Sequence, residues 1–333
     1  MVGIAVRRAA PLIALLLAAL PAAAFADVVD VVDDVVTPAY ADLAAAAAAL
    51  DQQAAADCAP DALRTGFNAV WDGWARIDFL RLGPVEVDGR VLAMHFWPDA
   101  KSSGARAQQA LIDAGAPAID DPAAFAELSV ALRGLAGLER LIYPSTLTGD
   151  DAVLCDLRRA TASDLAAMTA AISAEWPGYA TALTQPGGPG NTSFLTETEA
   201  RQAIFTQLVT GLTQLAETRL GRPLGSFDKP RPERAESVLS GRGLRNVTLS
   251  LTGIRDAALA LAPEAKATQT ALDGAIAMAE SLDDPALAGV ADPQSRLKIE
   301  ILAQTIIAAR DTLQAEIGGA LGLSVGFNAA DGD

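Results

Sequence analysis

Residues Asp42–Ala56 read DLAAAAAALDQQAAA, and this alanine-rich stretch decides the fold class. Alanine is the strongest helix former among the amino acids. Other parts of the chain repeat apolar residues every three or four positions, which is the spacing of one helical face. These stripes are Leu165, Met168 and Ile172; Ile204, Leu208, Leu212 and Leu215; and Leu302, Ile306, Ala309, Leu313 and Ile317. We therefore predict an all-α protein whose helices bury these stripes in two up-and-down bundles.

One segment interrupts the helical pattern with a turn signal. Val85–Val87 and Arg90–Met94 are compatible with strands, and they flank Asp88-Gly89. Asp-Gly between two such runs is typical of a tight hairpin turn. We therefore predict a small β-hairpin insertion near residues 85–96.

A second interruption predicts the domain boundary. Residues 184–193 contain the sequence PGGPG, which no helix tolerates. This composition favours a linker between an N-terminal bundle over residues 27–183 and a C-terminal bundle over residues 194–333. A long loop inside one domain is the alternative. The sequence RLGP at 81–84 is echoed by RLGRP at 219–223, which suggests that a duplication relates the two bundles.

The first 26 residues have the pattern of a secretory signal peptide. Arg7 and Arg8 precede the apolar stretch Ala9–Leu20, and Ala24–Ala26 forms an A-x-A cleavage site before Asp27. The apolar stretch is too short to span a bilayer comfortably, although a retained membrane anchor is the alternative. We expect residues 1–26 to be removed on export, and we expect no transmembrane segment in the mature chain.

Composition excludes several classes of function. The formal charge of −16 repels phosphate backbones, so we expect no nucleic-acid partner. Two cysteines and one histidine exclude four-cysteine zinc sites, iron–sulfur clusters and multi-histidine metal centres within one chain. Export favours a disulfide between Cys58 and Cys155 over two buried free thiols. The 97-residue separation would make that bridge worth about 4–5 kcal/mol on the loop-entropy model.

Five patches, in order along nearly the whole mature chain, together resemble the imelysin-like family of exported bacterial proteins. They are Trp71–Trp74 through Leu82–Pro84; Phe96–Asp99; Arg133–Tyr143; Arg231–Ser237 with Ser240–Arg242; and Leu323–Asn328 with Asp331–Asp333. The resemblance implies two helical bundles with a cleft between them and a periplasmic or outer-membrane-associated location. Some members of that family are described as metallopeptidases. Others accompany iron-uptake systems and are thought to bind a metal or a metal carrier.

The family's signature, G-x-H-x-x-E, is incomplete in this chain. Gly134 and Glu139 match the motif, but Ala136 stands where the family has histidine. A histidine at 136 and Glu139 would be i, i+3 neighbours able to reach one ion together, whereas alanine offers no ligand. Glu139 is then the only matched carboxylate, and one carboxylate rarely holds a transition metal alone. His95 cannot be shown from the sequence to replace the missing histidine.

Candidate ligand-binding residues come from the matched patches. Glu139 lies at the edge of an apolar face and needs a partner, for which we expect Arg76 or Arg242. That carboxylate either forms a buried ion pair joining two helices or binds a ligand in the cleft. Arg234, Ser237 and Arg242 either lie on a solvated helix face or line the cleft and bind an anion. Trp71, Trp74 and Trp97 are either core aromatics or, in the case of Trp97, part of the ligand site.

Two functional readings follow, and no catalytic residue is assigned in either. The first is a periplasmic binding or accessory protein in metal or iron acquisition, with its ligand in the cleft. The second is a peptidase or other hydrolase acting in the same cleft, which the missing motif histidine disfavours. A structural module of the envelope is a third alternative. The cofactor is unknown, with a metal ion as one candidate, and the partner is an unidentified small ligand or an envelope protein.

Overall fold

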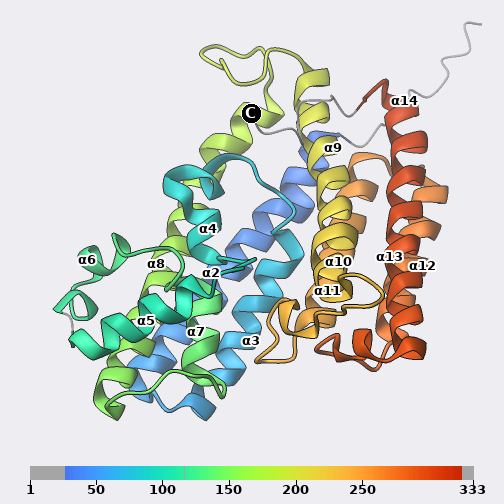
Figure 1. The fold of residues 1–333 in the computed structure, drawn as a ribbon. Helices are drawn as coiled ribbons and strands as arrows, with labels where there is room; N and C mark the ends of the chain where they lie inside the picture. The colour runs from blue at the N-terminus through green and yellow to red at the C-terminus, as the bar shows by residue number, and fades with distance from the viewer. Residues whose placement is uncertain (1–26, 116, 325–333) are drawn as a thin grey trace, which may run out of the picture.

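The computed structural model describes residues 27–115 and 117–324, which form an all-α protein (Figure 1). The predicted signal peptide and the end of the last matched patch, beyond Ser324, lie outside the described residues. Within the described ranges the only β-type pairing is an isolated bridge between Ser226 and Lys229. None of the described helices is long and apolar enough to cross a membrane.

The alanine-rich stretch is helical, as predicted, and it lies at the centre of the N-terminal half. Helix α2 (Thr37–Ala56) continues from α1 (Val28–Asp30) through a π-helical segment (Val31–Val36). It packs between α3 (Pro60–Ile77) and α8 (Asp151–Thr184). The α2 residues that face these neighbours are fully buried: Leu43, Ala47, Leu50 and Ala54.

The C-terminal half is a second set of helices, drawn in yellow to red in Figure 1. Its long helices are α9 (Glu197–Thr213), α11 (Gly243–Leu261), α12 (Lys266–Ser281) and α13 (Pro293–Leu313). A π-helical segment (Gln214–Leu220) joins α9 to α10 (Gly221–Leu224), and another (Gln314–Gly318) joins α13 to α14 (Gly319–Leu321). The predicted stripes of this half are buried, because each one faces the neighbouring helices.

The two halves touch directly along α3 and α11. Gly253 of α11 makes this contact close, because a Cβ there would lie 1.8 Å from the backbone oxygen of Arg76. Residues 185–193 are non-helical, as their composition predicted, while Thr184 is still the last residue of α8. The backbone of this loop bonds to the residues beside it: the Gly187 N–H donates to the Phe194 carbonyl at 2.8 Å. The division of the chain into two domains stays a prediction.

The predicted hairpin is wrong. Residues 83–94 form two 3₁₀ turns (Gly83–Val85 and Val87–Gly89) followed by α4 (Arg90–Met94). Asp88 and Gly89 do adopt the left-handed turn conformation, with φ of 52° and 67°. The chain then winds into a helix instead of a strand, because Val91 and Met94, three residues apart, are buried together in the core.

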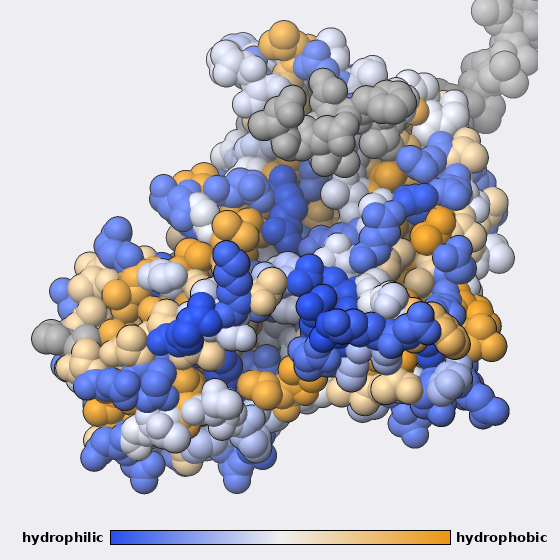
Figure 2. All heavy atoms as spheres, viewed as in Figure 1, coloured by the Kyte–Doolittle hydropathy of each residue, from blue (hydrophilic) through white to orange (hydrophobic). Residues whose placement is uncertain are grey.

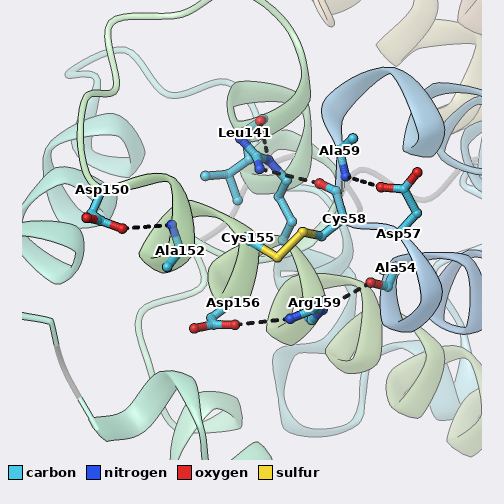
Figure 3. The surroundings of a disulfide bond; sticks show 11 residues. Ala54, Asp57, Cys58, Ala59, Leu141, Asp150, Ala152, Cys155, Asp156 and Arg159 are labelled. Atoms are coloured by element: carbon cyan, nitrogen blue, oxygen red, sulfur yellow. Dashed lines mark hydrogen bonds and ion pairs between the residues drawn. A yellow bond between two sulfur atoms is a disulfide. The ribbon is translucent and has the colours of Figure 1, made fainter.

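The predicted disulfide is confirmed. Cys58, just before α3, is bonded to Cys155 near the start of α8 (Figure 3). Arginines of α8 reinforce the same junction, because Arg159 donates to the Ala54 carbonyl at 3.2 Å and Arg158 to the Cys58 carbonyl at 3.3 Å. The bridge therefore fixes the α2–α3 connection to the start of α8.

Candidate functional site

A cavity of about 450 Å³ lies between the two halves of the chain. One wall consists of the connection from α4 to α5 (Ser103–Ala114) together with α7 (Gly134–Ile142). The other wall consists of Arg222 in α10 and of residues 233–235 and 237–239 in the segment between α10 and α11. Figure 2 shows a recess near the middle of this face, with strongly hydrophilic side chains on both sides of it.

The cavity gathers most of the predicted ligand-binding residues. Trp97, Glu139, Arg234 and Ser237 all line it, and so does the motif position Ala136. Trp97 is half-buried against the cavity, whereas Trp71 and Trp74 are core aromatics with 0% and 1% exposure.

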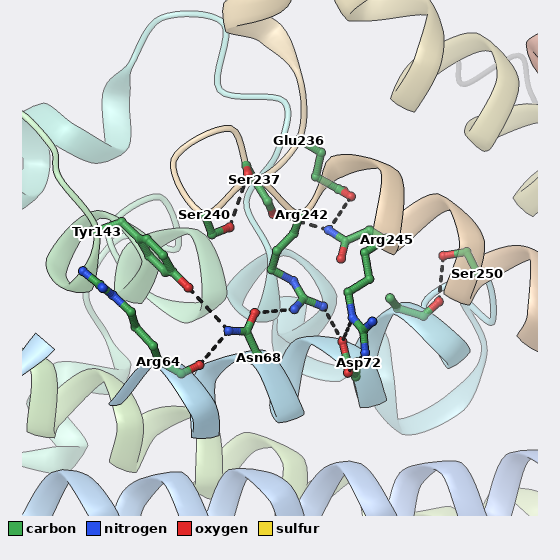
Figure 4. Close-up of polar contacts among 12 residues, drawn as sticks. Arg64, Asn68, Asp72, Tyr143, Glu236, Ser237, Ser240, Arg242, Arg245 and Ser250 are labelled. Atoms are coloured by element: carbon green, nitrogen blue, oxygen red, sulfur yellow. Dashed lines mark hydrogen bonds and ion pairs between the residues drawn. The ribbon is translucent and has the colours of Figure 1, made fainter. Parts of the chain in front are cut away.

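Two of the predicted residues lie elsewhere. Arg76 is exposed and lines a separate depression between α3, α11 and α12. Arg242 is buried behind the cavity wall, where it donates to Asn68 Oδ1 and, at 2.6 Å, to Asp72 Oδ1 (Figure 4). Burial opposes ionisation of Asp72, but hydrogen bonds from Arg245 and Arg242 lower its pKa. Arg242 thus attaches the start of α11 to α3.

The motif glycine is required by backbone packing at the start of α7. Gly134 has φ of +64°, and a Cβ there would lie 2.0 Å from the Ala93 oxygen and 2.5 Å from the Met94 oxygen. No other residue type fits that approach without displacing the end of α4. Buried Gln108 strengthens the same corner, because its Nε2 donates to the Leu132 carbonyl at 3.0 Å and the Gly137 carbonyl at 2.9 Å. The cavity wall therefore has a fixed shape.

Glu139, the motif glutamate, is held by a serine from the opposite wall. The backbone N–H and the hydroxyl of Ser240 donate to Glu139 Oε1 at 2.8 and 2.5 Å. The predicted arginine partner is wrong, because Asp72 engages Arg242 and Arg76 points away at the surface. Burial raises the pKa of Glu139, and the two Ser240 hydrogen bonds oppose that rise. Oε2 of Glu139 accepts no hydrogen bond from the described residues.

His95 lines the same cavity as Ala136, but its side chain is mostly buried, with 8% exposure. Its ring packs edge-on against Trp71 at 4.5 Å between centroids and lies parallel to Trp97 at 6.3 Å. Its Nδ1 lies 3.6 Å from Glu236 Oε1, the same oxygen that Arg219 Nε approaches at 3.1 Å. Burial, and then the charge of Arg219, lower the pKa of His95 to about 3. The imidazole is therefore neutral at pH 7.

Three arginines line the cavity, and sequence reasoning found only Arg234 among them. Arg140 and Arg222 also line it. Arg140 donates to neutral acceptors, Gln108 Oε1 at 2.5 Å and the Ala131 carbonyl at 2.8 Å. Their sequence neighbours could have identified both, since Arg140 follows Glu139 and Arg222 lies in the RLGRP echo.

The donor set does not fit a bare metal ion. Among residues 27–115 and 117–324, no three histidine, cysteine, aspartate or glutamate side chains converge as metal ligands. Besides Glu139, the cavity contains the carboxylates of Asp99 and Glu233. Asp99 accepts from the backbone N–H groups of Ser103 and Gly104 at 2.8 Å each, which caps the start of α5.

Comparisons with known proteins agree with this architecture. The sequence model of the imelysin family matches residues 36–313. The chain belongs to the imelysin family. It is also 25% identical over 319 residues to iron-regulated protein A of Synechococcus elongatus, a match that covers 86% of this chain and 83% of that protein.

Two crystal structures share the fold. An imelysin-like protein from Psychrobacter arcticum superposes with a TM-score of 0.75 at 20% identity, over 90% of this imelysin and 96% of that chain. A provisionally assigned iron-regulated protein A precursor from Parabacteroides distasonis gives a TM-score of 0.69 at 13% identity, over 87% and 93% of the two chains. The resemblance predicted from the sequence patches is therefore confirmed, together with the all-α class.

Proposed function

We propose that this imelysin is an exported accessory protein of iron acquisition that binds its ligand in the cavity between its two halves. One observation carries the proposal: the family-motif helix α7 and the arginine-bearing segment before α11 face each other across a cavity of about 450 Å³. That volume is within the range of small-molecule sites. The relative in Synechococcus elongatus, named an iron-regulated protein, supports the connection with iron.

Export to the periplasm is part of the proposal. It is supported by the pattern Arg7-Arg8, apolar stretch and A-x-A site, and by a disulfide that needs an oxidising compartment. Binding is favoured over peptide hydrolysis because Ala136 removes the motif's nitrogen ligand. His95, the remaining imidazole, is enclosed by Trp71 and Trp97 and approaches a glutamate that Arg219 already engages.

The test is thermal unfolding of the chain from Asp27 against a panel of ligands. The panel contains Fe²⁺ under anaerobic conditions, ferric citrate, a ferric hydroxamate, Zn²⁺, Cu²⁺ and Ca²⁺, each with a chelator control. At a hundred times the dissociation constant, one bound ligand adds about 2.7 kcal/mol, or roughly 4 °C for a chain of this length. We expect an iron species to give such a shift, with no cleavage of a peptide library.

A matched pair of variants places the site. Ala136→Phe fills the cavity beside α7 and should abolish the shift, whereas Ala55→Phe on the exposed face of α2 should leave it unchanged. Peptide cleavage that Ala136→Phe abolishes would instead favour the hydrolase. A shift that survives Ala136→Phe would place the ligand outside this cavity.

A further inference from the structure

We propose that the cavity binds a polycarboxylate anion, and that it accepts iron as an anionic carboxylate complex rather than as a bare ion. The inference rests on the proposed function for the iron, but its basis is the charge and bonding of three arginines. Arg140 projects from α7 on one wall, and Arg222 and Arg234 belong to the other wall.

The first step is that Arg222 and Arg234 have unused bonding capacity. Within residues 27–115 and 117–324, neither guanidinium group makes a hydrogen bond or an ion pair. Arg222 Nε is buried without any partner. A buried donor left unpaired costs about 1–3 kcal/mol, so a bound acceptor would remove that cost.

The second step is that the cavity's own acids are engaged elsewhere. Glu139 is bonded to Ser240, Asp99 caps α5, and Glu233 contacts Arg231 at 3.4 Å. None of these three carboxylates forms an ion pair with Arg140, Arg222 or Arg234 among the described contacts. The guanidinium groups of Arg222 and Arg234 are therefore available to an anion that enters from solvent, and Arg140 adds its Nη1, which makes no hydrogen bond among the described residues.

The third step is the match between guanidinium geometry and carboxylate. An arginine fork offers two parallel N–H donors to one carboxylate, so arginines on opposite walls favour a ligand with several carboxylates. Trp97 helps to place one of these arginines, because the Arg222 guanidinium carbon lies over its ring, 5.9 Å from the centroid. Ser237, which also lines the cavity, adds a hydroxyl group.

The same groups disfavour a bare cation. The three arginines offset the charges of Asp99, Glu139 and Glu233, so the lining has no net negative charge to attract a metal ion, and within the described residues it lacks three convergent ligand side chains. A polycarboxylate supplies both the ligands for iron and the negative charge that the arginines bind. The free anion and its ferric complex share this chemistry, and the experiment separates them.

The test is isothermal titration calorimetry of the chain from Asp27 with three probes: citrate, ferric citrate and anaerobic Fe²⁺. We expect citrate or ferric citrate to bind, with an affinity that falls as salt is raised. The double variant Arg222→Gln with Arg234→Gln should weaken that binding at least tenfold, and circular dichroism should confirm its fold. The control Arg76→Gln lies outside the cavity and should bind like the parent.

Each outcome decides one claim. Fe²⁺ binding that the double variant leaves intact would overturn the anion inference and leave the iron function standing. Binding of citrate but no ferric citrate would support the anion inference and contradict the iron function. Binding of ferric citrate that the double variant does not weaken would overturn the role of the arginines. No binding of any probe would overturn the inference.

Discussion

His95 offers the sharpest physical test of the site because it is the only histidine in the chain. Its side chain is 8% exposed, and it lies between Trp71 and Trp97. Burial and Arg219 lower its pKa from an ordinary value of 6.5 to about 3. Asp78 opposes this shift, while Arg81 and Arg140 add to it. The folded protein should therefore hold the imidazole neutral throughout the pH range in which the unfolded chain protonates it.

The sign and size of the effect on stability follow directly. Between about pH 6.5 and pH 3 the unfolded state binds more protons than the native state, so acid destabilises the fold. Relative to pH 7.5, this one group should lower the free energy of unfolding by about 2 kcal/mol at pH 5, at 1.36 kcal/mol per pKa unit. His95→Gln should remove that increment, so its stability should fall less steeply with acid.

The assay is NMR on protein made without a histidine tag, together with urea unfolding. The single imidazole Cε1–H resonance should keep its neutral position down to pH 5 in the folded protein. Unfolding curves at pH 7.5, 6 and 5 should show a smaller pH slope for His95→Gln than for the parent. A folded-state titration midpoint near 6.5 would refute the reasoning, because it would mean that Glu236 stabilises the charged imidazole despite its contact with Arg219.

Three further predictions concern the disulfide, the motif glycine and the motif glutamate. Replacing Cys58 and Cys155 by serine should remove about 4–5 kcal/mol, or roughly 7 °C of melting temperature for this chain length, and an unchanged thermal melt would contradict this. Gly134→Ala should cost at least about 2 kcal/mol in urea unfolding because its Cβ meets the Ala93 oxygen, and a neutral effect would disprove the close approach. Because the native pKa of Glu139 is raised, the contribution of this one carboxyl to parent stability should fall as pH rises above the ordinary value of 4.5, so the stability of Glu139→Gln relative to the parent should increase from pH 4.5 to 8. A relative stability that does not change with pH would show that the carboxyl is not perturbed.

The composition and apolar spacing of the sequence predicted the long helices well. They failed where contacts between residues far apart in the sequence determine the local structure. The stretch Asp42–Ala56 is helical on composition alone, and α2 adds only the turn before it. The hairpin prediction failed at Arg90–Met94, because Asp88-Gly89 sets a turn but not the structure that follows it. Burial of Val91 and Met94 against the core selected a helix there.

The candidate site was likewise predicted from the sequence only in part. The family patches placed Trp97, Arg234 and Ser237 beside Glu139, and the structure brings all four to one cavity. The partner of Glu139 could not be found from the sequence, because Ser240 lies 101 positions away and nothing local marks the contact. The close contact between the motif glycine, Gly134, and the end of α4 is likewise visible only in three dimensions.

The most direct test of the account is a crystal structure of the chain from Asp27 soaked with ferric citrate, with diffraction recorded at the iron absorption edge. We expect an anomalous iron peak in the cavity between α7 and residues 233–239, with ligand carboxylates on Arg222 and Arg234. A peak bonded directly to protein carboxylates, or one lying outside this cavity, would contradict the account.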